Sequence, residues 1–247
     1  LPYWSDMATS LPDATGSDGN VDARTVALQE CLAYFTELWH QRKNNPADTM
    51  DLISLLATNP ATRNMVDDPL EYLGNLILLI VGGNDTTRNS ITGGVLALHE
   101  NPDQFTKLRS NLNLIPSMVS EVIRWQTPLM HMRRIATRDI ELGGRTIRKG
   151  DKVVMWYLSG NHDETAINQP NEFIIDRTNP RYHLSFGFGI HRCMGNRLGE
   201  MQLRVLWEEI LKRFSKVEVI GEPERVLSNF VRGYSALPVR LHGLSSF

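Results

Sequence analysis

The sequence has 247 residues, a formal net charge of −2 and a hydrophobic fraction of 41%, which is the composition of a globular protein with enough chain to bury a core. The absence of a basic excess argues against a nucleic-acid partner, and the longest apolar run, Leu76 to Val81, is far too short to span a membrane. The only two cysteines, Cys31 and Cys193, lie far apart, which argues against a disulfide scaffold and suits a reducing cytoplasm.

The first half of the chain is predicted to be helical. Apolar spacing and cap signals predict helices over residues 1–11, 21–42, 48–58, 69–100, from 102 onward, and over 116–125. The longest of these helices has Asp68 as its N-cap and Pro69 in its first turn, and Asn101-Pro102 follows its end. At ~1.5 Å per residue it is roughly 46 Å long, enough to cross a whole domain.

After Pro128 the pattern changes. Short β-rich runs broken by glycine pairs predict small antiparallel strands over 133–157. An irregular segment over 161–183, a cysteine loop over 186–195, a final helix over 194–214 and weak strands near 216–220 and 238–241 complete the chain. We therefore predict one mainly α domain with a minor β portion.

The cysteine loop carries the most specific pattern, F-G-x-G-x-H-x-C-x-G, formed by Phe186, Gly187, Gly189, His191, Cys193 and Gly195. Glycines let the backbone turn tightly and approach a flat partner. Cys193 precedes a predicted helix, whose N-terminus stabilises a thiolate, and a thiolate is a good axial ligand for iron. The alternative is a buried free cysteine, which would not require these residues at these offsets. The absence of C-x-x-C and C-x-x-C-H excludes zinc ribbons and c-type haem attachment.

This pattern resembles the haem-thiolate loop of the cytochrome P450 family. The resemblance implies the cytochrome P450 fold and haem b as cofactor, with Cys193 as the metal ligand and His191 on a haem propionate. It also places Phe186, Gly187 and Gly195 against the haem.

A second motif lies midway along the long predicted helix, in IVGGNDTTRNSITGG. A glycine pair there, Gly82-Gly83, costs about 1 kcal/mol per residue relative to alanine, and on its own it fits a helix-packing notch equally well. Beside the cysteine loop, it resembles the oxygen-binding groove of the family. That resemblance implies that Thr86 holds the bound O2 through hydrogen bonds and that Asp85 relays protons.

Two further resemblances concern charged residues. Glu121 and Arg124 share one face of a helix in SEVIRW; alone, they fit an exposed ion pair. In the family such a pair is buried and bound to an arginine matched here by Arg177, with a structural role. HMRRIATRDIELGG resembles the strand that carries a propionate-binding arginine and favours Arg134 over Arg133, the alternative being a surface arginine.

The resemblance extends over nearly the whole chain and is closest to bacterial medium-chain alkane ω-hydroxylases. Because the chain starts at Leu1 and its opening reads as an internal segment, we expect the C-terminal portion of the enzyme. The missing N-terminal part would cover a haem edge, so we expect this piece alone to bind haem weakly or not at all.

The implied reaction is insertion of one oxygen atom from O2 into a C–H bond of an alkane or fatty acid, in the cytoplasm. Electrons come from NAD(P)H through a ferredoxin reductase and an iron–sulfur ferredoxin, for which Arg192, Arg197 and Arg204 are either a docking face or a solvated surface. A terpene or steroid substrate, a thiolate-haem sensor or isomerase, and a haem-free interaction domain stay open. Expected substrate contacts are Leu78, Leu129, Met130, Met132 and Phe230.

Overall fold

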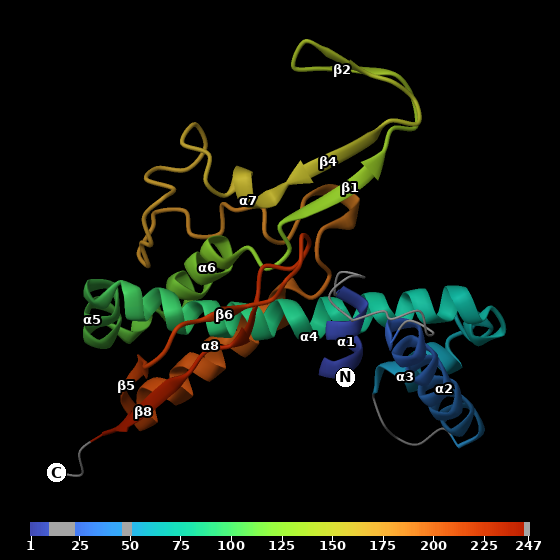
Figure 1. Ribbon diagram of the computed structural model, residues 1–247, viewed down its shortest axis with the longest axis horizontal. Coiled ribbons are helices and arrows are strands. Elements are labelled where there is room, and N and C mark those ends of the chain that lie inside the picture. The colour runs from blue at the N-terminus through green and yellow to red at the C-terminus, as the bar shows by residue number, and fades with distance from the viewer. Residues whose placement is uncertain (10–22, 46–50, 245–247) are drawn as a thin grey trace. The chain divides into compact units, whose positions relative to one another are not determined.

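The computed structural model describes residues 1–9, 23–45 and 51–244, and the chain divides into two compact units, Leu1–Asp85 and Thr86–Phe247. Parts of the helices predicted over 1–11, 21–42 and 48–58 fall outside the described residues. The α-helices are α1 (Pro2–Thr9), α2 (Ala23–Asn44), α3 (Leu52–Thr58), α4 (Pro69–Glu100), α5 (Pro102–Ser110), α6 (Ile115–Gln126), α7 (Tyr157–Gly160) and α8 (Asn196–Arg213), shown in Figure 1. Short 3-10 turns within the described residues are η2 (Met65–Asp67), η3 (Leu112–Leu114) and η4 (Gly189–His191).

The first unit is helical and has its own apolar core. Trp39 of α2 is fully buried and packs edge-on against Tyr72 of α4, with ring centroids 5.1 Å apart. The Tyr72 hydroxyl donates to the Phe35 carbonyl at 2.9 Å, and burial raises the pKa of Tyr72 to about 12. Burial also raises the pKa of the Cys31 thiol, so this cysteine is a core residue rather than a reactive one.

Helix α4 begins and ends where its sequence signals predict. Asp68 accepts hydrogen bonds from the backbone N–H groups of Leu70 and Glu71, at 3.1 and 3.0 Å, as an N-cap does. The helix ends at Glu100, before Asn101-Pro102. The predicted range of 69–100 is therefore confirmed.

The second unit is built on α6 and α8, which pack with the C-terminal half of α4 around Trp207, Met118 and Val122. Close approach is possible because α4 carries Gly93 and Gly94 there. A Cβ at Gly93 would lie 2.2 Å from the Gln126 side chain, and one at Gly94 would lie 3.1 Å from Val122. Gly93 and Gly94 thus form the packing notch of α4, which lies further along the helix than Gly82-Gly83.

The strands of this unit form four antiparallel pairs. β1 (His131–Ile135) pairs with β4 (Lys152–Trp156), β2 (Ile140–Leu142) with β3 (Arg145–Ile147), β5 (Phe214–Val219) with β8 (Val239–Gly243), and β6 (Glu224–Arg225) with β7 (Tyr234–Ala236). Figure 1 shows the β1–β4 ribbon continuing outward into the β2–β3 hairpin. The predicted mainly α fold with a minor β portion is confirmed.

Boundaries differ from prediction in two places. The β region starts at His131 rather than 133, and Tyr157 belongs to α7 instead of a strand. The final helix starts at Asn196, two residues later than predicted, because Gly195 has a non-helical backbone and serves as its N-cap. Among the residues that the structure describes, none of the helices combines the length and the apolar character that crossing a membrane requires.

Candidate functional site

Cys193 lies in an exposed loop directly before α8. Its backbone N–H donates to the Phe186 carbonyl at 2.8 Å, and the Gly187 N–H donates to the Leu184 carbonyl at 2.7 Å. These two hydrogen bonds close the loop on itself. The sulfur therefore sits on a defined backbone turn while its side chain stays accessible.

Two of the three loop glycines have backbone conformations that favour glycine. Gly187 has φ +68° and Gly189 has φ +74°, in the left-handed region that costs other residues roughly 1–2 kcal/mol. A Cβ at Gly187 would also lie 3.1 Å from the Tyr157 hydroxyl, so this glycine lets the loop approach α7. Gly195 differs, with φ −90°; a Cβ there would lie 4.0 Å from the Cys193 sulfur.

Apolar side chains flank Cys193 and point into solvent. Phe188, Ile190 and Met194 are 81%, 97% and 93% exposed, and several large apolar side chains exposed in one loop are typical of a binding surface. A soft sulfur donor among apolar side chains and glycine backbone is suited to the iron of a flat ring such as haem. The residues present therefore fit a haem-thiolate site.

Phe186, predicted to lie against the haem, is half-buried and packs on the core of the second unit. Its ring also contacts that of His183, with centroids 5.5 Å apart. Burial, followed by the charge of Arg124, lowers the pKa of His183 to about 4. His183 is therefore neutral near pH 7, and its Nδ1 accepts the Ser185 N–H at 3.3 Å.

The groove residues lie midway along α4. Asp85 is buried and Thr86 is partly buried, and the Thr86 carbonyl accepts a hydrogen bond from the Ser90 hydroxyl at 2.7 Å. A Cβ at Gly82 or Gly83 would meet no described atom within 4 Å. Within the described residues, these two glycines therefore border open space and do not form the packing notch that was their alternative interpretation.

The two residues predicted to bind propionates are on separate elements. His191 is exposed in η4, and Arg134 is partly exposed in β1, where its guanidinium donates to the Arg133 carbonyl at 3.0 Å. No hydrogen bond or ion pair joins Arg134 to His191 among the residues described. Both side chains can thus turn toward an anionic ligand.

Glu121, Arg124 and Arg177 form a buried ionic triad. Glu121 is fully buried on α6 and accepts from both other members: from Arg124 Nε and NH2, each at 2.8 Å, and from Arg177 Nε at 2.9 Å. Its carboxylate also accepts the Ile174 N–H at 2.9 Å. The triad therefore binds the irregular segment to α6, and the alternative of an exposed ion pair is excluded.

The predicted substrate contacts fall into two groups. Met130 N–H donates to the Phe230 carbonyl at 3.0 Å, and Leu129 belongs to the same antiparallel contact; Met132 follows in β1. Leu78, on α4 in the first unit, is 67% exposed. The structure thus brings Leu129, Met130 and Phe230 together from segments about a hundred residues apart.

Three polar residues behind the loop were not predicted from the sequence: Asn161, Ser185 and His183. Asn161 is fully buried, and its side chain donates to the Ser185 hydroxyl at 2.9 Å. A polar residue next to the F-G-x-G pattern was the available signal for Ser185 and His183, whereas nothing in the sequence around Asn161 indicates its partners.

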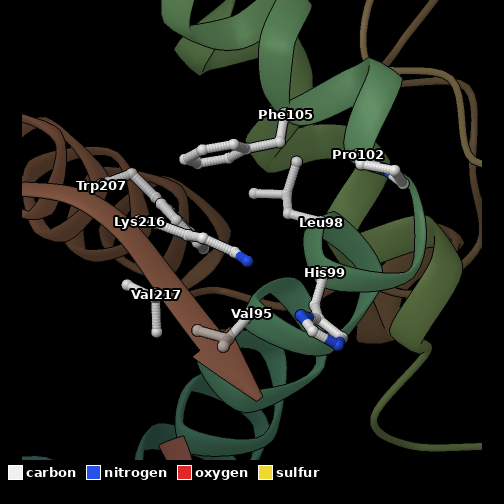
Figure 2. Close-up of a pocket in the computed structure, with 8 residues that line it drawn as sticks. All are labelled: Val95, Leu98, His99, Pro102, Phe105, Trp207, Lys216 and Val217. Atoms are coloured by element: carbon white, nitrogen blue, oxygen red, sulfur yellow. The ribbon is translucent and has the colours of Figure 1, made fainter. Parts of the chain in front are cut away.

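A cavity of about 100 Å³ lies elsewhere in the second unit, between the ends of α4, α5, α8 and β5. Figure 2 shows the Phe105 ring and the Lys216 amine pointing into it. It shares no residue with the cysteine loop or with the predicted substrate contacts. This cavity is therefore separate from the candidate site.

The family model described as Cytochrome P450 matches residues 19–232. A linalool 8-monooxygenase from Pseudomonas putida is 41% identical over 87% of this chain and 52% of its own length. A methyl-branched lipid omega-hydroxylase from Mycobacterium bovis is also 41% identical, over 84% of this chain and 48% of its own length. The chain thus spans about half the length of the curated relatives it matches.

Among solved structures, a cytochrome P450-153 from Novosphingobium aromaticivorans has 48% sequence identity and a TM-score of 0.88, covering 98% of this chain and 58% of that chain. The matched region includes the long helix, the buried triad and the cysteine loop. The fold and the sequence therefore lead to one conclusion: the chain belongs to the cytochrome P450 family.

Proposed function

We propose that the protein is a haem-thiolate monooxygenase that hydroxylates the terminal carbon of a medium-chain alkane or fatty acid. The observation that carries the proposal is the exposed Cys193, held by backbone hydrogen bonds in a glycine turn among exposed apolar side chains. When bound, haem b supplies the activation of O2 and its insertion into a C–H bond. Family membership and the resemblance to alkane ω-hydroxylases support this assignment.

In this proposal Cys193 holds the iron through its sulfur, and Phe186, Gly187 and Gly195 form the loop surface that faces the ring. The first turn of α8 has backbone N–H groups without partners inside the helix, and they follow Cys193 directly. His191 and Arg134 bind the two propionates, an assignment supported by their partly or fully exposed positions.

In this proposal Asp85 and Thr86 would hold and transfer protons beside the haem. The Thr86 hydroxyl donates a hydrogen bond at the O2 site, and the Asp85 carboxylate takes up a proton and passes it on. Burial of Asp85 supports this role, because a carboxylate away from bulk water exchanges protons through defined neighbours.

The proposed substrate contacts are all apolar: Leu78 in the first unit, and Leu129, Met130, Met132 and Phe230 in the second. Apolar walls recognise hydrocarbon mainly through buried area, which suits an alkyl chain. The omega-hydroxylase relative, named for a methyl-branched lipid, supports terminal oxidation. The relative named linalool 8-monooxygenase supports a terpene as the second candidate substrate.

Electrons are proposed to come from NAD(P)H through a ferredoxin reductase and an iron–sulfur ferredoxin in the cytoplasm. Arg192 and Arg197 are exposed beside the cysteine loop, and Arg204 pairs with Glu208 at 3.6 Å on the exposed side of α8. Such a basic face would steer an acidic donor and raise its encounter rate. Two cysteines far apart suit a reducing compartment.

Product analysis tests the substrate. The haem-loaded protein, supplied with ferredoxin, reductase and NADH, is given n-octane, octanoic acid and linalool separately, with the Cys193→Ala variant as control. Terminal hydroxylation of octane or octanoic acid supports the proposal. Hydroxylation of linalool alone would replace the substrate with a terpene. No product from a protein that binds haem through Cys193 would favour a thiolate-haem sensor or isomerase.

A further inference from the structure

Asn161 lies at the end of α7, is fully buried, and has its whole side chain engaged. Its Oδ1 accepts the Leu184 N–H at 2.6 Å, and its Nδ2 donates to the Thr127 hydroxyl at 2.8 Å and the Ser185 hydroxyl at 2.9 Å. One side chain therefore joins α7, the end of α6 and the irregular segment that leads into the cysteine loop.

A chain of hydrogen bonds runs from Asn161 to Cys193. The Leu184 N–H donates to the Asn161 side chain, and the Leu184 carbonyl accepts the Gly187 N–H at 2.7 Å. The adjacent Phe186 carbonyl accepts the Cys193 N–H at 2.8 Å. Three hydrogen bonds thus connect the backbone of Cys193 to the side-chain amide of Asn161.

The other side of Asn161 is fixed by the buried triad. The backbone carbonyl of Asn161 accepts a hydrogen bond from Arg124 NH1 at 2.7 Å, and Arg124 in turn pairs with Glu121. The Ser185 hydroxyl donates in turn to the Ile123 carbonyl of α6 at 2.8 Å. Asn161 is therefore connected to α6 both through Arg124 and through Ser185, so the position of the loop depends on this helix.

Glycines permit this close contact between α7 and the loop. A Cβ at Gly160 would lie 2.6 Å from Leu184 Cδ1, and one at Gly187 would lie 3.1 Å from the Tyr157 hydroxyl. Both positions would push the loop away from Asn161 if they carried a side chain. The hydrogen bonds and the packing thus require the same geometry.

We propose that Asn161 is the positioning residue that sets where the Cys193 sulfur stands. The proposal rests on the proposed function, in which Cys193 holds the haem iron. Asn161 touches neither haem nor substrate, and it acts through Leu184 and Ser185. Leucine at this position would leave the buried Leu184 N–H without its acceptor, and the Thr127 and Ser185 hydroxyls would each lose the donor that Asn161 provides.

The test compares Asn161→Leu, which has nearly the same shape and no polar atoms, with Asn171→Leu in the same irregular segment, where the asparagine side chain is exposed. The readouts are the carbonyl spectrum of the reduced haem-loaded protein and hydrogen exchange of the Leu184 and Cys193 amides. In Asn161→Leu, most of the haem should lose the red-shifted band of thiolate ligation at unchanged haem content. Amide exchange at Leu184 should accelerate about tenfold or more, as loss of one hydrogen bond predicts.

Ser185 provides the rescue. Ser185→Ala should lose part of the red-shifted band, Ser185→Thr should restore it, and adding Ser185→Ala to Asn161→Leu should cause little further loss, because both act on one network. Asn161→Leu with the wild-type fraction of red-shifted band and unchanged amide exchange would overturn the proposal, even if its melting temperature falls. A full-length wild-type protein that binds haem without that band would instead overturn the proposed function, whereas the exchange data would still report on Asn161.

Discussion

Replacing Glu121 by glutamine is the sharpest test of the buried triad. The change keeps the size of the side chain and removes its charge. Each carboxylate oxygen accepts two donors: Oε1 from Arg124 NH2 and Ile174 N–H, and Oε2 from Arg124 Nε and Arg177 Nε. Whichever oxygen becomes an NH2 group, two buried donors lose their acceptor and face another donor.

The expected loss follows from those contacts. Hydrogen bonds to charged groups contribute about 1.5–3 kcal/mol each, so two lost bonds correspond to roughly 3–6 kcal/mol, and breaking a buried ion pair typically costs about 3–5 kcal/mol. Since a whole domain is stable by only about 5–15 kcal/mol, Glu121→Gln should bring the protein close to unfolding at room temperature.

Asp176→Asn is the matched control. It makes the same carboxylate-to-amide change in the same segment, but Asp176 pairs with Lys107 at 3.0 Å with both side chains about two-fifths exposed, 41% and 39%. An exposed pair contributes about 0–1 kcal/mol. Both variants are measured by reversible urea unfolding, followed by tryptophan fluorescence. Equal losses below about 1 kcal/mol would refute the burial argument.

Three further predictions concern single residues. Because the pKa of His183 falls from 6.5 to about 4 on folding, the unfolded chain binds more protons than the folded chain between these two pH values. Between pH 7 and pH 4 the free energy of unfolding of the wild-type protein should therefore fall by about 3 kcal/mol relative to that of His183→Phe. The same change with pH in both proteins would contradict this prediction. Gly187→Ala should destabilise the protein by about 1–2 kcal/mol in a thermal melt, since φ is +68°; no change would mean that the loop can adopt another turn. Thr86→Ala should leave the binding constant for the substrate nearly unchanged while diverting electrons to peroxide, measured as peroxide formed per NADH consumed. Unchanged coupling would remove the proposed role of Thr86.

Features set by neighbouring residues were predictable from the sequence. The limits of α4 follow from Asp68, Pro69 and Asn101-Pro102, which act within one helical turn. The turn around Cys193 was likewise predictable, because the glycine conformations at Gly187 and Gly189 depend on the local backbone.

Features that depend on distant contacts were not predictable in this way. The short β6 and β7 were not predicted from the sequence, and the pair holds two to three residues per strand. The role of Asn161 depends on partners 23 to 37 positions away, and the one that leads to the cysteine loop is the backbone N–H of Leu184. Backbone groups occur at every residue, so no sequence pattern marks them. The alternative for Gly82-Gly83 was likewise decided only by three-dimensional surroundings.

The carbonyl difference spectrum of the reduced protein tests the central claim, that Cys193 holds a haem iron through its sulfur. We predict a red-shifted carbonyl band in the full-length wild-type protein and loss of that band in full-length Cys193→Ala. Cys31→Ala, which changes the buried cysteine of the first unit, should keep the band. A red-shifted band that survives in Cys193→Ala would contradict the account.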